Sequence, residues 1–309
     1  MRISELKTER QSRASEDLDR LSALDIATLM NREDAKVARA VRKVLPEIAL
    51  AIDVVHERLA RGGRLIYVGS GTSGRIGALD AAECPPTFGT APEMVQYVIA
   101  GGEQALGRAS EASEDSAELG ARDMAARRPG KRDVVVGLSA SGSTPYTVGA
   151  LTYAGKKGSA TIAVACNRGS ELAKAAAIAI EAEVGPEVLT GSTRLKAGTA
   201  EKTICNMLTT GAMARLGYVY GNLMVRLPAK NRKLIERGTA MVQRIAHVDR
   251  SVALSSLEAA DMNVSVALVM LCGEVGKAEA VRRLKRAQGN VRKIIDRASR
   301  YLTNDKPER

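Results

Sequence analysis

Aromatic residues are nearly missing from this sequence, which has no tryptophan, one phenylalanine and seven tyrosines in 309 residues. Proteins that bind single-stranded nucleic acid stack bases on aromatic side chains, so the deficit argues against that role. The formal net charge is nevertheless +11. Ten basic and three acidic residues between Arg282 and Arg309 account for about +7 of it. The charge is therefore a property of the C-terminal tail, and we expect no nucleic-acid partner.

Long apolar runs are also absent. No stretch reaches the roughly 18 apolar residues that a membrane span requires. The N-terminus, "MRISELKTERQSRASEDLDR", is charged from its start and has no apolar signal-peptide core. We therefore expect a cytoplasmic protein without a membrane partner.

Cysteine and histidine are scarce and scattered. The four cysteines form no C-x-x-C pair, which argues against a disulfide framework or a zinc site. His56 and His247 each stand alone in a helical pattern, where packing or surface roles are commoner than metal binding. We expect reduced, mostly buried thiols and no metal.

Apolar periodicity predicts an α/β domain in the first two thirds of the chain. Apolar residues at three-and-four spacing predict an amphipathic helix from Asp34 to Leu59, which Pro46 kinks or restarts. Short apolar runs rich in β-formers predict buried parallel strands. These runs cover residues 64–69, 94–100, 133–140, 160–166 and 176–185. Helical segments separate most of them, so we predict a doubly wound, mostly parallel sheet in a three-layer arrangement.

The rest of the chain has a helical pattern. A long helix begins near Ser192, "YVYGNLMVRL" (218–227) reads as an extended excursion, and short helical pieces follow residue 230. We therefore predict three parts. They are an N-terminal helical segment (1–60) packing on the α/β domain, the α/β domain itself (61–230), and a small helical domain with a basic tail (231–309).

Two predicted strand-to-helix junctions are rich in small hydroxyl side chains. The junctions are "GSGTSGR" (69–75) and "SASGSTPY" (139–146), and their hydroxyl residues are Ser70, Thr72, Ser73, Ser139, Ser141, Ser143 and Thr144. Hydroxyls and backbone N–H groups at a helix N-terminus suit a phosphate. Taken alone, each motif is equally typical of a turn that caps the following helix and binds no ligand. Because ligands bind at the carboxyl ends of parallel strands, the pair favours one anion held between them.

Neither junction matches a nucleotide-binding fingerprint. No Gly-Lys-Ser/Thr follows either loop. Gly69, Gly71 and Gly74 fit the Gly-x-Gly-x-x-Gly spacing, but the next strand ends without the acid that a dinucleotide site requires. We therefore expect an intact phosphate held by hydroxyls, and no cofactor.

Two glutamates are candidates for acid–base chemistry. Glu83 follows an Ala-rich helix and precedes two prolines, so we expect it partly buried, with a raised pKa, within reach of the first junction. Glu114 lies in an acidic segment with a helical pattern, where most glutamates are solvated. Arg194 and Lys196 lie either near the site or on a solvated helix start. From the residues alone, a solvated surface role without a part in the chemistry stays open for all four.

The paired junctions resemble the sugar isomerase (SIS) phosphosugar-binding domain. The wider sequence resembles the N-acetylmuramic acid 6-phosphate etherases over most of the chain. Its most distinctive segments are "DAAECPPTFG" (80–89) and "GPEVLTGSTRLKAGTA" (185–200), and the C-terminal helices are similar to the family's small bundle. The chain departs from the family pattern at Ser143, where arginine is expected, and at Ser70, where alanine is more usual.

The resemblance implies an etherase that converts N-acetylmuramic acid 6-phosphate into N-acetylglucosamine 6-phosphate and D-lactate during recycling of cell-wall sugars. Removal of the C2 proton, which is α to the C1 aldehyde of the open-chain sugar, permits lactate to leave C3, and water then adds there. By the resemblance, Glu114 takes the C2 proton. Glu83 protonates the departing lactate oxygen and later activates water. The route uses no metal.

Two other functions stay open. One is a non-catalytic phosphosugar-binding regulator, similar to glucokinase regulatory protein, although that protein resembles two such domains in tandem. The other is a sugar phosphate isomerase, which shares the α-proton chemistry. SIS-type proteins resemble one another in pairing, so we expect a homodimer whose sites can borrow residues across the interface.

Overall fold

The computed structural model describes residues 6–108, 113–227, 229 and 231–296. Their contacts divide the chain into two compact units, Met1–Ala82 with Pro92–Ala212, and Glu83–Ala91 with Met213–Arg309. Two of the three boundaries fall inside helices, α3 (Gly71–Phe88) and α7 (Lys196–Leu216), and the third lies between Ala91 and Pro92. The last part of the basic tail, beyond residue 296, lies outside the described residues.

The first unit is built on a five-stranded sheet in the order β2-β1-β3-β4-β5, and every pairing is parallel. The strands are β1 (Leu65–Gly69), β2 (Val95–Ile99), β3 (Val134–Leu138), β4 (Ala160–Ala165) and β5 (Ile178–Glu181). All five predicted strands are thus confirmed. The chain runs outward from β1 to β2 and then returns to β3, so the topological switch point lies between β1 and β3.

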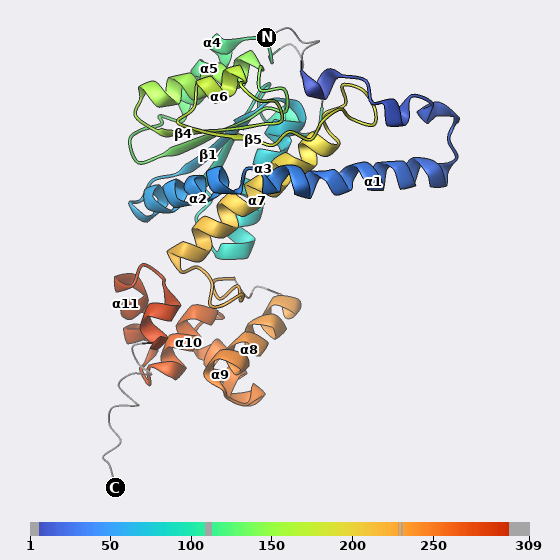
Figure 1. Cartoon of the computed structure of the whole chain (residues 1–309). Helices are drawn as coiled ribbons and strands as arrows, with labels where there is room; N and C mark the ends of the chain where they lie inside the picture. The colour runs from blue at the N-terminus through green and yellow to red at the C-terminus, as the bar shows by residue number, and fades with distance from the viewer. Residues whose placement is uncertain (1–5, 109–112, 228, 230, 297–309) are drawn as a thin grey trace. The chain divides into compact units, whose positions relative to one another are not determined.

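Helices cover both faces of this sheet, which confirms the predicted three-layer fold (Figure 1). One face carries α4 (Ala117–Ala126), α5 (Pro145–Lys156) and α6 (Glu171–Lys174), whose apolar side chains share a core with Ile66 and Val135 of the sheet. The other face carries α2 (Leu45–Ala60), α3 and α7 (Figure 1). The strands are therefore buried on both faces, as their continuous apolar runs predict.

A buried polar contact joins β1, α3 and α7. The Tyr67 hydroxyl donates to Asp80 Oδ2 at 2.8 Å, and the Thr209 hydroxyl donates to Asp80 Oδ1 at 3.2 Å. Burial raises the pKa of Asp80 above its ordinary value, and the two hydroxyls act against that rise. The contact fixes α3 and α7 against the strand that leads into the first hydroxyl-rich junction.

The N-terminal segment is helical. Three 3-10 turns (Lys7–Glu9, Arg13–Ser15 and Leu18–Arg20) precede α1 (Ala23–Arg42), which starts before the predicted helix. The Ser22 hydroxyl caps α1 by accepting the Asp25 N–H. Pro46 stands in the first turn of α2, so it restarts the helix there, as expected of a proline.

Lys196 ties α7 to α1. Its side chain is 2% exposed, and its ammonium group donates to Glu33 Oε2 at 2.9 Å. Burial alone would raise the pKa of Glu33, but hydrogen bonds from Lys36 and Lys196 hold that pKa below its ordinary value. Glu187, also buried, accepts the backbone N–H groups of Lys196 and Ala197 at the start of α7. The solvated role left open for Lys196 is therefore wrong.

We expect Lys196→Met to lower the free energy of unfolding by about 3–5 kcal/mol, because it leaves a buried carboxylate with one partner fewer. The double variant Glu33→Leu/Lys196→Met should recover most of the loss. Arg194→Met, at an exposed position, should change stability by less than about 0.5 kcal/mol. Urea denaturation compares the three, and a Lys196→Met loss no larger than that of Arg194→Met would show that the ion pair does not stabilise the fold.

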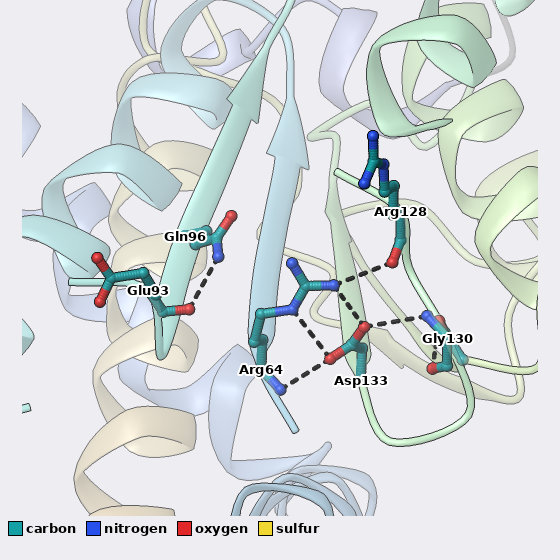
Figure 2. A network of polar contacts seen from close by, with 7 residues as sticks. Arg64, Glu93, Gln96, Arg128, Gly130 and Asp133 are labelled. Carbon is teal, nitrogen blue, oxygen red and sulfur yellow. Dashed lines mark hydrogen bonds and ion pairs between the residues drawn. The ribbon is translucent and has the colours of Figure 1, made fainter. Parts of the chain in front are cut away.

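An ion pair fixes the amino-terminal ends of β1 and β3 (Figure 2). Arg64 donates to Asp133 Oδ1 through its backbone N–H and Nε, at 2.9 and 3.2 Å, and to Oδ2 through Nη2 at 2.7 Å. The Gly130 N–H also donates to Asp133, and Arg64 Nη2 donates to the carbonyl of Arg128. These contacts hold the two strands in register from the end opposite the hydroxyl-rich junctions.

The second unit is helical in its described residues, as predicted. It contains α8 (Arg232–Ala246), α9 (Arg250–Ala259), α10 (Val264–Cys272) and α11 (Lys277–Arg286) around one apolar core. The predicted extended excursion is reduced to an isolated bridge between Tyr220 and Leu223. Most of α10 is buried, so this helix forms the centre of the unit.

The four cysteines are free thiols, and Cys84, Cys166 and Cys205 are buried. This agrees with the reduced, mostly buried thiols predicted from their spacing. None of the helices in the described part of the chain combines the length and apolar character that a membrane crossing requires.

Candidate functional site

The two hydroxyl-rich junctions follow β1 and β3, the strands that flank the switch point. Gly69 at the end of β1 lies opposite Leu138 at the end of β3. The segments that follow therefore leave the sheet side by side, at the edge where open α/β sheets bind ligands. Each leads into a helix, because α3 begins at Gly71 and α5 at Pro145. The structure thus brings the seven predicted hydroxyl residues to one edge of the sheet.

The first junction contains a buried hydroxyl that lacks a partner among the described residues. This is Ser70 Oγ, one residue before α3 begins. Thr72 is half-buried, whereas Ser73 is buried and donates to Glu201 Oε1 at 2.9 Å. The first turn of a helix presents free backbone N–H groups and the positive end of the helix dipole. An anion at this point would find both those groups and the Ser70 hydroxyl.

The hydroxyls of the second junction are joined to one another. Ser139 Oγ lies 2.8 Å from Thr144 Oγ1 and 3.3 Å from Ser141 Oγ. The Ser143 hydroxyl donates to Ser141 Oγ at 3.0 Å, and the Gly142 N–H donates to Ser139 Oγ at 3.0 Å. A hydroxyl can turn its hydrogen from one acceptor to another. The cluster is therefore pre-arranged to reorient its donors toward a bound anion.

Glu114 contacts both junctions. Its backbone carbonyl accepts the N–H of Tyr146, in the first turn of α5, at 3.0 Å. Its Oε1 lies 3.3 Å from the point that a Cβ on Gly71 would occupy. Gly71 has φ +51°, so glycine both permits this turn and leaves room for the carboxylate. Glu114 itself lies in a turn before α4, not in the helix that its segment suggests.

Glu83 lies far from the first junction of its own chain. It is exposed and stands on α3 twelve residues beyond Gly71. At about 1.5 Å per residue, that is about 18 Å along the helix axis. The expectation of a partly buried Glu83 within reach of the first junction is therefore wrong. The expectation is wrong because α3 starts immediately after Ser70 and runs unbroken through Pro85 and Pro86 to Phe88.

A second carboxyl, which the sequence did not single out, lies at the first junction. Glu201 on α7 is 1% exposed, and its Oε2 has no hydrogen-bond partner among the described residues. Burial raises the pKa of Glu201 to about 8, although the hydrogen bond from Ser73 opposes the shift. At neutral pH the carboxyl is therefore mostly neutral and does not repel an anion at the start of α3. Its only sequence signal is the small-residue setting "KAGTAEK" (196–202).

Glu201 should make the protein less stable as pH rises. The ordinary pKa of 4.5 applies in the unfolded chain, and the folded pKa is about 8. Between these values the folded state keeps a proton that the unfolded state has released, so stability falls by about 1.4 kcal/mol per pH unit. Glu201→Gln, which stays neutral, should lack this slope. The free energy of unfolding of both proteins, measured from pH 5 to 8, tests this prediction. The same dependence on pH in the wild type and in Glu201→Gln would contradict a buried, protonated Glu201.

A separate cavity of about 570 Å³ adjoins β2 and α4. None of the seven hydroxyl residues, nor Glu83 or Glu114, is among its described lining residues. Three of its charged groups already have partners, since Arg127 donates to the carbonyl of Tyr97 and Arg122 pairs with Asp123. No group of three His, Cys, Asp or Glu able to hold a metal occurs in the described residues.

Comparison with known families points to the same domain type. Residues 47–155 match the family model of the glucokinase regulatory protein N-terminal SIS domain, and residues 104–211 match that of the SIS domain. The two matches together span both hydroxyl-rich junctions and Glu114. The α/β unit thus has a SIS-type fold.

The chain is also similar to curated proteins over nearly its whole length. It is 48% identical over 295 residues to the N-acetylmuramic acid 6-phosphate etherase of Clostridium beijerinckii, covering 96% of this chain and 97% of that protein. The corresponding enzyme of Mycolicibacterium smegmatis is 50% identical, covering 96% and 99%. That of Klebsiella aerogenes is 48% identical, covering 95% and 98%. The chain therefore belongs to the N-acetylmuramic acid 6-phosphate etherase family.

Proposed function

We propose that this protein is a carbon–oxygen lyase that cleaves the D-lactyl ether of N-acetylmuramic acid 6-phosphate. Its products are N-acetylglucosamine 6-phosphate and D-lactate, formed in the cytoplasm during recycling of cell-wall sugars. The observation that carries the proposal is 48–50% identity to etherases over 95–96% of the chain. The placement of Glu114 against both hydroxyl-rich junctions supports it.

The phosphate is held by the two junctions. Ser70 and Thr72 supply hydroxyls and Ser73 its backbone N–H at the start of α3, and the cluster of Ser139, Ser141, Ser143 and Thr144 supplies the rest. Each of these donors is neutral, so the positive end of the α3 dipole provides much of the attraction. A neutral Glu201 beside Ser73 leaves this attraction intact. The phosphate acts as a handle that fixes the sugar, and it is not transferred.

The reaction is an elimination followed by addition of water. Glu114 takes the proton from C2, the electron pair of that bond forms the C2–C3 double bond, and the bond from C3 to the lactyl oxygen breaks. Glu83 gives its proton to the departing lactate. Water then adds at C3, with its proton passing to Glu83, while Glu114 returns a proton to C2. The net change is hydrolysis of the ether.

Both glutamates must reach neighbouring carbons of one sugar. Carboxyl pairs that act on one sugar bond lie about 5–10 Å apart. Within one chain, Glu114 lies against Gly71 whereas Glu83 stands about 18 Å further along the same helix. We therefore infer that Glu83 acts in the site of a second copy, and that the working form is a homodimer. Leu79, one turn before Glu83 on the same helix face, is 43% exposed, as expected of a face that a partner covers.

The test is incubation of the purified protein with N-acetylmuramic acid 6-phosphate, followed by enzymatic detection of D-lactate. In deuterated water, the N-acetylglucosamine 6-phosphate formed should carry deuterium at C2. An isomerase would rearrange a sugar phosphate without releasing lactate, and a regulator would bind the substrate unchanged. The proposal fails if no lactate appears under conditions where the Klebsiella aerogenes relative releases it.

A further inference from the structure

The second unit contains a cavity that the proposed reaction does not use. Its volume is about 390 Å³. The polar lining residues are Arg226, Asn263, Ser265 and Lys285, and the others are Gly89, Val266, Val281, Leu284 and Gly289. None of these described residues is acidic. The Ser265 hydroxyl already donates to the Val225 carbonyl, and Asn263 Oδ1 accepts the Val266 N–H. The cavity therefore presents two positive charges and the Asn263 side-chain NH₂ against an apolar wall.

Arg226 is held in place but is not fully hydrogen-bonded. The central carbon of its guanidinium group lies 3.6 Å from the centroid of the Tyr218 ring, which fixes the plane of the group by stacking. Its Nη1 is buried and has no hydrogen-bond partner among the described residues. A buried donor without a partner costs free energy, and a buried guanidinium nitrogen costs more because it is charged. The stacked group is thus an ordered donor that lacks its acceptor.

Glycine leaves the space around this guanidinium open. Gly289 has φ +80°, and a Cβ there would come within 2.9 Å of Arg226 Nη1. Gly89 approaches the backbone of the same residue, where a Cβ would lie 2.4 Å from the Arg226 carbonyl oxygen. Both glycines line the cavity. Any larger residue at either position would displace Arg226.

Lys285 supplies the second cation. It is exposed, stands in the last turn of α11, and has no acidic partner among the described residues. The surrounding segment strengthens its effect, since residues 213–309 contain 19 Lys and Arg and nine Asp and Glu, a difference of +10. Such a field attracts anions toward the cavity.

We propose that this cavity is a binding site for a small oxyanion, either a phosphate monoester or a carboxylate. The Arg226 fork matches two oxygens of such a group, and Lys285 balances its charge. The apolar wall of Val266, Val281 and Leu284 accommodates the carbon part of the ligand. Phosphate and carboxylate share this chemistry, so the probes in the test distinguish them. The proposal is independent of the reaction assigned to the first unit.

The test follows the Arg226 side chain by NMR in the full chain labelled at arginine Nε. Arg226→Lys, which lacks an Nε, identifies the resonance by its loss. Titration with inorganic phosphate or acetate should shift this resonance to saturation. In Lys285→Gln, the dissociation constant for the tighter probe should rise at least about tenfold. Lys293→Gln removes the same charge from an exposed position of the same unit and should leave it unchanged.

A second measurement does not need the resonance assignment. Phosphate or acetate should raise the melting temperature less in Lys285→Gln than in Lys293→Gln, since both variants keep the junctions of the first unit. The stronger of the two probes identifies the class of oxyanion. A resonance that does not saturate with either probe, or equal behaviour of the two lysine variants, would overturn the proposal.

Discussion

Glu114→Gln is expected to lower kcat for lactate release by about 10²–10⁴-fold and to leave KM within about threefold. The amide has nearly the shape of the carboxylate, so it fits the space beside Gly71, where the carboxylate oxygen lies 3.3 Å from a would-be Cβ. It cannot accept a proton from C2. Binding, which rests on the two hydroxyl-rich junctions, is therefore kept while the first chemical step is lost.

Exchange at C2 separates this role from a structural one. With the wild-type protein in deuterated water, N-acetylglucosamine 6-phosphate itself should exchange its C2 proton, and Glu114→Gln should stop that exchange. Glu118→Gln, at an exposed position in the first turn of α4, is the matched control and should retain full activity. If Glu114→Gln keeps more than a tenth of the wild-type kcat, Glu114 is not the base.

The sheet and its hydroxyl-rich edge could be predicted because their signals are local. Each strand is a short apolar run, and each hydroxyl-rich junction follows its strand directly in sequence. The parallel order then places the ends of β1 and β3 together, as Gly69 opposite Leu138 shows. Pro46 likewise acts within its own turn, so its effect on α2 follows from the sequence alone.

The burial of Lys196 and Glu201 could not be predicted, because it depends on contacts between distant parts of the chain. Lys196 bonds Glu33 across 163 positions, and Ser73 bonds Glu201 across 128. A charged residue in a helical pattern is usually solvated, so nothing in the local sequence marks these as buried. The expectation for Glu83 is wrong for a different reason. Its neighbour Pro-Pro suggests a helix end, yet a helix that passes through both prolines carries it away from the first junction.

The separation of Glu83 from the first junction predicts that two inactive variants restore activity when they pair. Glu83→Ala and Glu114→Ala should each be nearly inactive alone, but a one-to-one mixture refolded together should regain about a quarter of the wild-type activity. Random pairing makes half of the dimers mixed. In each mixed dimer, one site receives Glu114 from the first chain and Glu83 from the second, while the other site receives neither.

A lactate assay on the refolded mixture measures the recovery, and differently tagged chains show that mixed dimers have formed. The matched control pairs Glu83→Ala with Glu83→Gln, which also form mixed dimers but cannot assemble a site with both glutamates. Recovery in the first mixture alone requires the two residues to come from different chains. Mixed dimers without activity would mean that both act within one chain. The roughly 18 Å that α3 places between Gly71 and Glu83 argues against that outcome, because a rigid helix cannot shorten to bring a proton donor to the carbon beside the base.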